Sequence, residues 1–105
     1  MTGKYEAVVV GARVAGAAAA AFLSHAGCRV LLLDRAPVSR PPVSSPIFFA
    51  NTLHALRRLG MLPRVEALGS PPLRLYQVRL GDIFLRGRML PYQGIDHAFS
   101  IRRER

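Results

Sequence analysis

Two glycines five residues apart follow a valine-rich segment near the N-terminus. The run from Gly11 to Gly16 reads Gly-Ala-Arg-Val-Ala-Gly, which is the pattern G-x-G-x-x-G with Arg13 in place of the middle glycine. Between a strand and a helix, such a run binds a pyrophosphate, because Gly11 permits a tight turn and the helix N-terminus offers unpaired N–H groups. Gly16 lets the helix lie close to the strands. The predicted dinucleotide-binding residues are Gly11, Ala12, Arg13, Val14, Ala15 and Gly16.

Arg13 is the one departure from the pattern. Arginine restores a Cβ at a position where glycine lets the backbone approach the phosphates, so we expect a left-handed backbone conformation there, at some cost. Its guanidinium would compensate by reaching a phosphate.

Asp34 supplies the second chemical group. It stands 18 residues after Gly16, at the end of a second apolar segment. A carboxylate in this position accepts hydrogen bonds from a ribose hydroxyl and repels a 2′-phosphate. The residue therefore favours a dinucleotide without a 2′-phosphate and disfavours NADP as the ligand of this unit.

The elements that must position these groups form a βαβ unit over residues 5–35. Residues 5–10 and 29–33 are short runs of Val and Leu, which predict buried parallel strands that are apolar on both faces. Residues 14–26 are rich in alanine and predict a helix, which Gly27 ends. The fold class is thus α/β, with a Rossmann-like unit and parallel strands.

The rest of the chain does not repeat this pattern. Residues 36–50 are rich in Pro and Ser and predict a loop. Residues 51–69 predict a helical segment, with a helix over 51–59 capped by Asn51 and further turns over 62–68 that begin near Pro63. Residues 72–105 predict a β-hairpin that turns at Gly81-Asp82, a strand over 98–101 and a tail. We expect an incomplete domain.

Composition narrows the class of protein. The chain has 105 residues, a formal net charge of +9 and one cysteine, Cys28. Its arginines are scattered, so we expect no nucleic-acid partner, although a basic nucleic-acid-binding module remains an alternative. The apolar stretch 7–23 contains Arg13 and two glycines, which argues against a membrane span. A single cysteine and widely spaced histidines predict no disulfide and no metal site, and favour the cytoplasm.

Several of these segments resemble one family. Residues 5–16, Tyr-Glu-Ala-Val-Val-Val-Gly-Ala-Arg-Val-Ala-Gly, together with Leu33-Asp34-Arg35, resemble the N-terminus of FAD-dependent monooxygenases and reductases of the para-hydroxybenzoate hydroxylase type. The geranylgeranyl-reductase-like branch is similar, and an arginine in the middle of the glycine run is familiar there. Residues 51–62 are similar to the helix and "LGLL" turn that follow in the family, and residues 101–105 to its "RRExLD" stretch.

The resemblance implies FAD as cofactor and NAD(P)H as co-substrate of the full-length enzyme. It implies that Asp34 and Arg35 lie at the adenosine ribose, and that Arg40 and Arg102 contact the cofactor. It assigns no catalytic residue and no metal ligand to this chain. The resemblance places the family's later Asp-Gly and Gly-Asp motifs beyond residue 105, so we expect the N-terminal portion of a longer enzyme, without catalytic competence in isolation.

Two alternatives remain open. The first is an NAD-binding Rossmann module of another oxidoreductase, against which the hairpin after residue 70 argues, because such modules continue with alternating strands and helices. The second is the basic nucleic-acid-binding module, whose affinity would fall steeply with salt.

Overall fold

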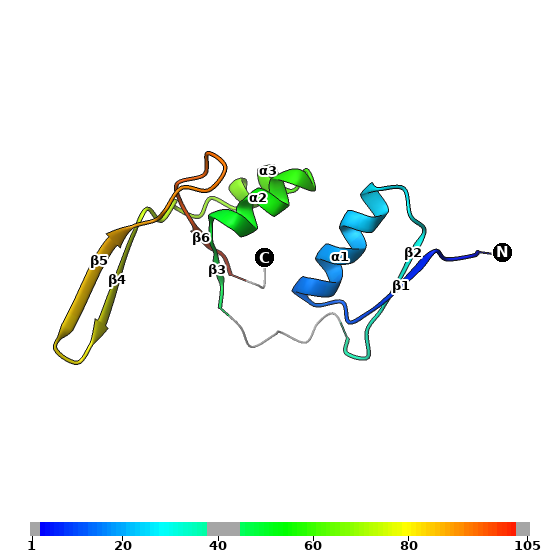
Figure 1. The fold of residues 1–105 in the computed structure, drawn as a ribbon, viewed down its shortest axis with the longest axis horizontal. Coiled ribbons are helices and arrows are strands. Elements are labelled where there is room, and N and C mark those ends of the chain that lie inside the picture. Colours follow the sequence, from blue (N-terminus) through cyan, green and yellow to red (C-terminus); the bar gives the residue numbers. More distant parts are fainter. Residues whose placement is uncertain (1–2, 38–44, 103–105) are drawn as a thin grey trace. The chain divides into compact units, whose positions relative to one another are not determined.

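The computed structural model describes residues 3–37 and 45–102. The chain divides into two compact units, Met1–Pro42 and Val43–Arg105 (Figure 1).

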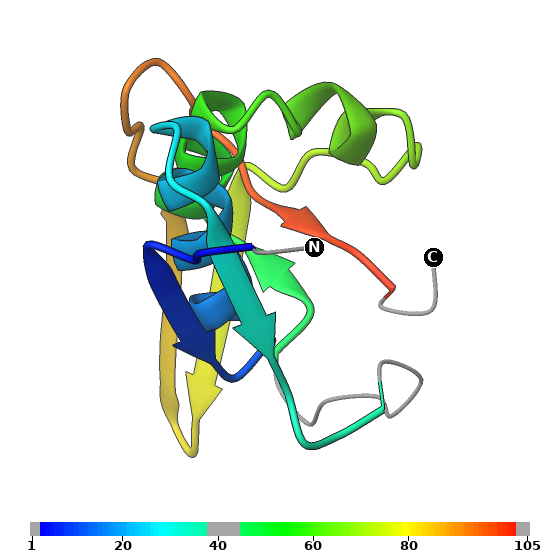
Figure 2. The same cartoon turned by 90° about the vertical axis from the view of Figure 1, so that its right-hand side faces the viewer.

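The first unit is a βαβ unit with a parallel pair of strands, as the sequence predicts. Strand β1 (Ala7–Val10) leads to helix α1 (Val14–His25) and then to strand β2 (Val30–Leu33). The two strands pair in parallel from Ala7↔Val30 to Val10↔Leu33, and Figure 2 shows their arrows pointing the same way. After α1 the chain turns at Gly27, whose φ of 91° is left-handed, so the predicted helix stop is confirmed.

The burial of these strands differs from the prediction. Val8 and Val10 are 58% and 82% exposed, and Ala20 is the one buried residue among the described residues of this unit. Successive side chains of a strand point to opposite faces. Val9 lies on the face toward α1, since a Cβ at Gly16 would be 3.5 Å from its Cγ1. The face that carries Val8 and Val10 has no covering layer within the described part of this unit.

The second unit contains the hydrophobic core. Helix α2 (Ala50–Arg58), helix α3 (Leu62–Glu66) and the antiparallel pair of strand β3 (Ile47–Phe48) and strand β6 (Phe99–Ser100) surround it. Leu53 is fully buried at its centre. The other buried members are Ala50, Ile95, Phe99 and Ile101, with Phe48, Leu56, Leu62, Val65 and Leu68 packed against them.

Two details of this unit differ from the sequence-based prediction. The predicted loop contains β3, which pairs with β6 and is extended by a hydrogen bond from the Ile101 N–H to the Pro46 carbonyl (3.0 Å). Helix α2 begins at Ala50 with Phe49 as N-cap and without a side-chain capping bond, so the prediction that Asn51 caps it is wrong. Asn51 lies inside the first turn, because the N-cap is two residues earlier in the chain than this polar side chain suggests. Helix α3 has a proline in its first two positions, as predicted.

The hairpin is formed by strand β4 (Leu75–Leu80) and strand β5 (Ile83–Arg88) and turns at Gly81, where φ is 57°. Its register gives it two unlike faces. The apolar face carries Tyr76, Val78 and Leu80 opposite Gly87, Leu85 and Ile83, with the Tyr76 ring over Gly87. The other face carries Leu75, Gln77 and Arg79 opposite Arg88, Arg86 and Phe84.

Within the parts of the chain that the structure describes, no helix has the length and apolar character needed to cross a bilayer. In the same residues, no group of three or more His, Cys, Asp or Glu side chains is arranged to hold a metal ion.

Candidate nucleotide-binding site

The glycine run forms the loop between the C-terminal end of β1 and the start of α1. Gly11 has a φ of 104°, which only glycine adopts readily. Its N–H donates to the Leu33 carbonyl at the end of β2 (2.7 Å), so the loop leaves the sheet where both strands end. Parallel sheets bind ligands at this edge, outside the carboxyl ends of the strands.

The Asp34 carboxylate lies against this loop. Its Oδ2 accepts a hydrogen bond from the Ala12 N–H (2.6 Å), and its Oδ1 accepts one from the Ala36 N–H (2.7 Å). These two bonds, from Ala36 first and then Ala12, lower the pKa of Asp34 below its ordinary value, and the positive charges of Arg13 and Arg35 lower it further. The exposed carboxylate is therefore ionised at neutral pH.

Glycine is required at position 16 because α1 lies in close contact with the glycine loop there. A Cβ at this position would overlap the carbonyl oxygen of Gly11 and lie 2.8 Å from its carbonyl carbon. The close approach that the sequence predicts between helix and strands thus includes a contact between α1 and the turn itself. Any side chain at residue 16 would push the helix and the loop apart.

Arg13 is not in the left-handed conformation that the missing glycine suggested. It is the N-cap of α1 with φ −79° and ψ −170°, which is extended backbone that any residue adopts without strain. Its carbonyl accepts the first helical hydrogen bond, from the Ala17 N–H (2.8 Å). The side chain is exposed and makes no hydrogen bond or ion pair with another residue that the structure describes.

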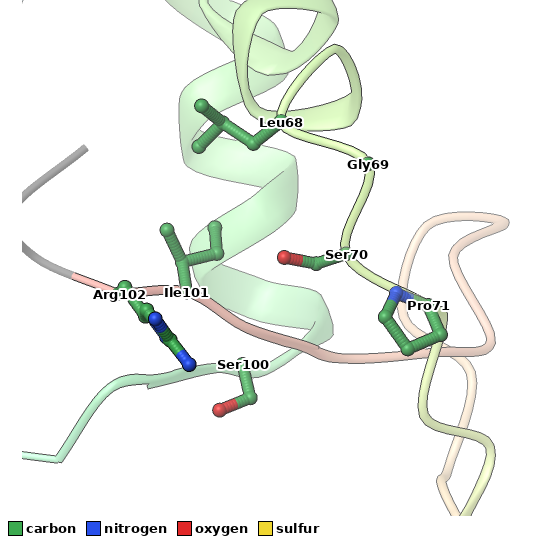
Figure 3. Close-up of a pocket in the computed structure, with 7 residues that line it drawn as sticks. All are labelled: Leu68, Gly69, Ser70, Pro71, Ser100, Ile101 and Arg102. Carbon is green, nitrogen blue, oxygen red and sulfur yellow. The ribbon is translucent and has the colours of Figure 1, made fainter.

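The remaining predicted cofactor contacts are Arg35, Arg40 and Arg102. Arg35 is exposed beside Asp34, whereas Arg40 lies outside the described residues. Arg102 belongs to the second unit, where it lines a cavity of about 290 Å³ together with Ser70 and Ser100. Figure 3 shows the Ser70 hydroxyl pointing across that cavity toward Ile101.

Two hydrogen bonds of the site, both to Asp34, carry no signal in the sequence, although Ala12 itself is predicted as part of the glycine run. Ala12 and Ala36 hold Asp34 through their backbone N–H groups, and every residue except proline has such a group. Only the chain geometry reveals them. The apolar residues Val14 and Ala15 place the first turn of α1 beside the loop and carry no charge of their own.

A glycine turn at the carboxyl end of a parallel strand, a helix behind it and an acid at the end of the next strand define a dinucleotide-binding α/β protein. The family model described as "FAD binding domain" matches residues 4–86, which span all of β1 to β4 and most of β5. The chain belongs to this FAD binding domain family. Its dinucleotide is FAD, and its class is that of the flavin-dependent oxidoreductases.

Proposed function

We propose that the first unit holds the ADP half of FAD where β1 and β2 end. The pyrophosphate lies at the N-terminus of α1, and the adenosine ribose is held by Asp34. The observation that carries this assignment is the hydrogen bond between the Asp34 carboxylate and the Ala12 N–H, because it unites the ribose-binding acid and the phosphate-binding loop in one site.

The residues present fit an anionic dinucleotide. Helix α1 has twelve residues and no acidic side chain in its first turn. The N–H groups of Val14, Ala15 and Gly16 lack acceptors within the helix, because no helical carbonyl precedes them by four residues. Together with the helix dipole they favour a negative group at this end. The charge of Arg13, one residue before the helix, adds to the attraction.

We further propose that the protein is a monooxygenase or reductase of the para-hydroxybenzoate hydroxylase type, with NAD(P)H as co-substrate. When bound, FAD would supply the redox chemistry, the transfer of reducing equivalents from NAD(P)H to oxygen or to a double bond. The residues described here bind and orient the cofactor. Arg35 and Arg102 would add contacts to FAD, and we expect no NAD(P)H oxidation from the 105-residue chain alone. The free Cys28 is consistent with the reducing cytoplasm.

The test uses fragments of the cofactor. The ¹⁵N-labelled chain is titrated with FAD, ADP, FMN and NADP⁺, and the amide signals of Gly11 and Ala12 are followed. We expect FAD and ADP to shift these signals, while FMN, which lacks the adenosine, leaves them in place. NADP⁺ binds more weakly than ADP because its 2′-phosphate meets Asp34.

A matched pair of variants locates the site. Asp34→Ala should weaken FAD binding by about tenfold, because the carboxylate's charged hydrogen bonds to the ribose are lost. Asp82→Ala removes another exposed acid, from the turn of the hairpin, and should leave FAD binding unchanged. If FMN shifts the loop amides as FAD does, or if the two variants behave alike, the assignment of the ADP half to this loop is wrong.

A further inference from the structure

We propose that Asp34 is a positioning residue for the glycine loop as well as a ligand of the ribose: its carboxylate holds the loop in the pyrophosphate-binding conformation before any nucleotide arrives. That the loop binds the pyrophosphate of FAD rests on the proposed function. The holding of the loop by Asp34 does not, and the two are tested separately.

The geometry places two consecutive amides of the loop on the end of β2. The Gly11 N–H donates to the Leu33 carbonyl (2.7 Å), and the next N–H, that of Ala12, donates to the Asp34 carboxylate (2.6 Å). The first bond continues the backbone pairing of β1 with β2. The second satisfies an N–H group that has no backbone partner in the sheet, because the chain turns away there. The carboxylate thus bridges 22 residues of sequence at the point where the backbone leaves the sheet.

A second bond fixes the carboxylate itself. Its other oxygen accepts from the Ala36 N–H (2.7 Å), in the segment that follows β2. Both oxygens are therefore oriented by backbone donors, one on each side. The charged side chains that act on the carboxylate, Arg13 and Arg35, are both positive and keep it ionised.

The acceptor capacity of a carboxylate allows both roles together. An ionised carboxylate has about four acceptor sites, two on each oxygen. The Ala12 and Ala36 N–H groups take one on each, so one site on each oxygen remains, which matches the two hydroxyls of a ribose diol. A ribose that carries a 2′-phosphate offers one hydroxyl fewer and brings a repelling charge.

The chemistry also explains why the residue is aspartate. Both partners are N–H donors, so the asparagine amide could satisfy only one of them and would turn its own N–H₂ toward the other. Glutamate keeps the charge but moves the carboxylate outward by one methylene. For holding the loop we therefore expect aspartate to be best, glutamate to be weaker and asparagine to be weakest.

The experiment is hydrogen exchange of individual amides in the ligand-free chain. In Asp34→Asn, the Ala12 amide should exchange about threefold to tenfold faster than in the parent protein, because a charge-assisted bond in an exposed position is lost. Asp34→Glu should fall between the two, and Asp82→Asn, at the hairpin turn, should match the parent. Unchanged protection of Ala20 in α1 shows that the unit is folded.

A titration of the parent protein needs no variant. As the pH falls through the lowered pKa of Asp34, the carboxylate is protonated and the Ala12 and Ala36 amide signals should shift together with that pKa. The positioning role is wrong if the Ala12 amide exchanges at the same rate in Asp34→Asn as in the parent protein, or if its signal does not shift as Asp34 titrates. This holds even if the variant binds FAD more weakly. If the loop is released in Asp34→Asn but FAD affinity is unchanged, the positioning role stands and the proposed ribose site is wrong.

Discussion

Substituting Gly16 by alanine is a stringent test of the site, because the added methyl group has two opposite effects on stability, a gain in helix propensity and a clash with the loop. Alanine is the best helix former, so the change should stabilise α1 by about 1 kcal/mol if only propensity counted. The same methyl group would lie on the Gly11 carbonyl, 2.8 Å from its carbon. Real Cβ atoms are essentially never so close to backbone atoms.

The clash should outweigh the gain in helix propensity. Overpacking costs about 1–3 kcal/mol, and occasionally more. Here the obstacle is a backbone carbonyl that cannot rotate away, so we take about 2–3 kcal/mol. After subtraction of the propensity gain, a net loss of about 1–2 kcal/mol remains, which corresponds to a factor of about 5–30 in the opening equilibrium of the unit. FAD affinity should fall by at least the same factor, because the loop that the added methyl group displaces is the loop that binds the pyrophosphate.

The assay is native-state hydrogen exchange of the β1 and α1 amides, followed by an FAD titration. Gly3→Ala is the matched control, since a Cβ at Gly3 meets nothing within 4 Å and its φ is not left-handed; it should change stability by less than about 0.5 kcal/mol. Equal or greater protection in Gly16→Ala would refute the packing of α1 on the loop, since propensity alone would then have decided the outcome.

Three further outcomes test other parts of the molecule. Leu53→Ala should destabilise the second unit by about 2–5 kcal/mol in a urea titration, whereas Leu90→Ala, at a residue 87% exposed, should change little; similar midpoints would contradict the core assignment. His97→Ala should raise the pKa of Asp96, which the hydrogen bond from the His97 ring lowers first and the charge of Arg74 second. Any stability that this pair contributes is present above the ordinary pKa of Asp96 and is lost as the pH falls through the lowered pKa, as ¹³C NMR of the carboxyl group would show; an unmoved titration would count against the bond. Arg13→Gln should weaken FAD binding about threefold and flatten its salt dependence, and an unchanged affinity at low salt would exclude a phosphate contact.

The local features of the fold could be predicted from the sequence because their causes are local. A valine run, an alanine run and Gly27 set the βαβ unit within about thirty residues, a short distance over which spacing and propensity decide the structure. The roles of Gly11 and Gly16 can be predicted for the same reason. The hairpin followed from alternation and from the turn at Gly81.

The remaining features depend on partners far away in the chain. Strand β3 has two residues and no alternation, and it forms only because β6, some fifty residues later, pairs with it. The bond between Ala12 and Asp34 uses a backbone group that the sequence cannot distinguish from any other. Arg13 misled the prediction because the pattern assumes a glycine conformation that this loop does not adopt. The prediction that β1 and β2 are buried on both faces is wrong, because an apolar sequence shows only what a strand can bury. The burial that is observed depends on the layers packed against the strand.

The two unlike faces of the β4–β5 hairpin have a consequence for the colloidal behaviour of the protein. Leu80 and Ile83, beside the turn, are 65% and 61% exposed, and an exposed apolar strand pair of this kind is a template for edge and face association between molecules. Arg79, Arg86 and Arg88 on the opposite face, within a chain of net charge +9, keep such molecules apart by repulsion. Solubility is then controlled by ionic strength: salt that screens the arginines removes the repulsion and leaves the apolar attraction in place.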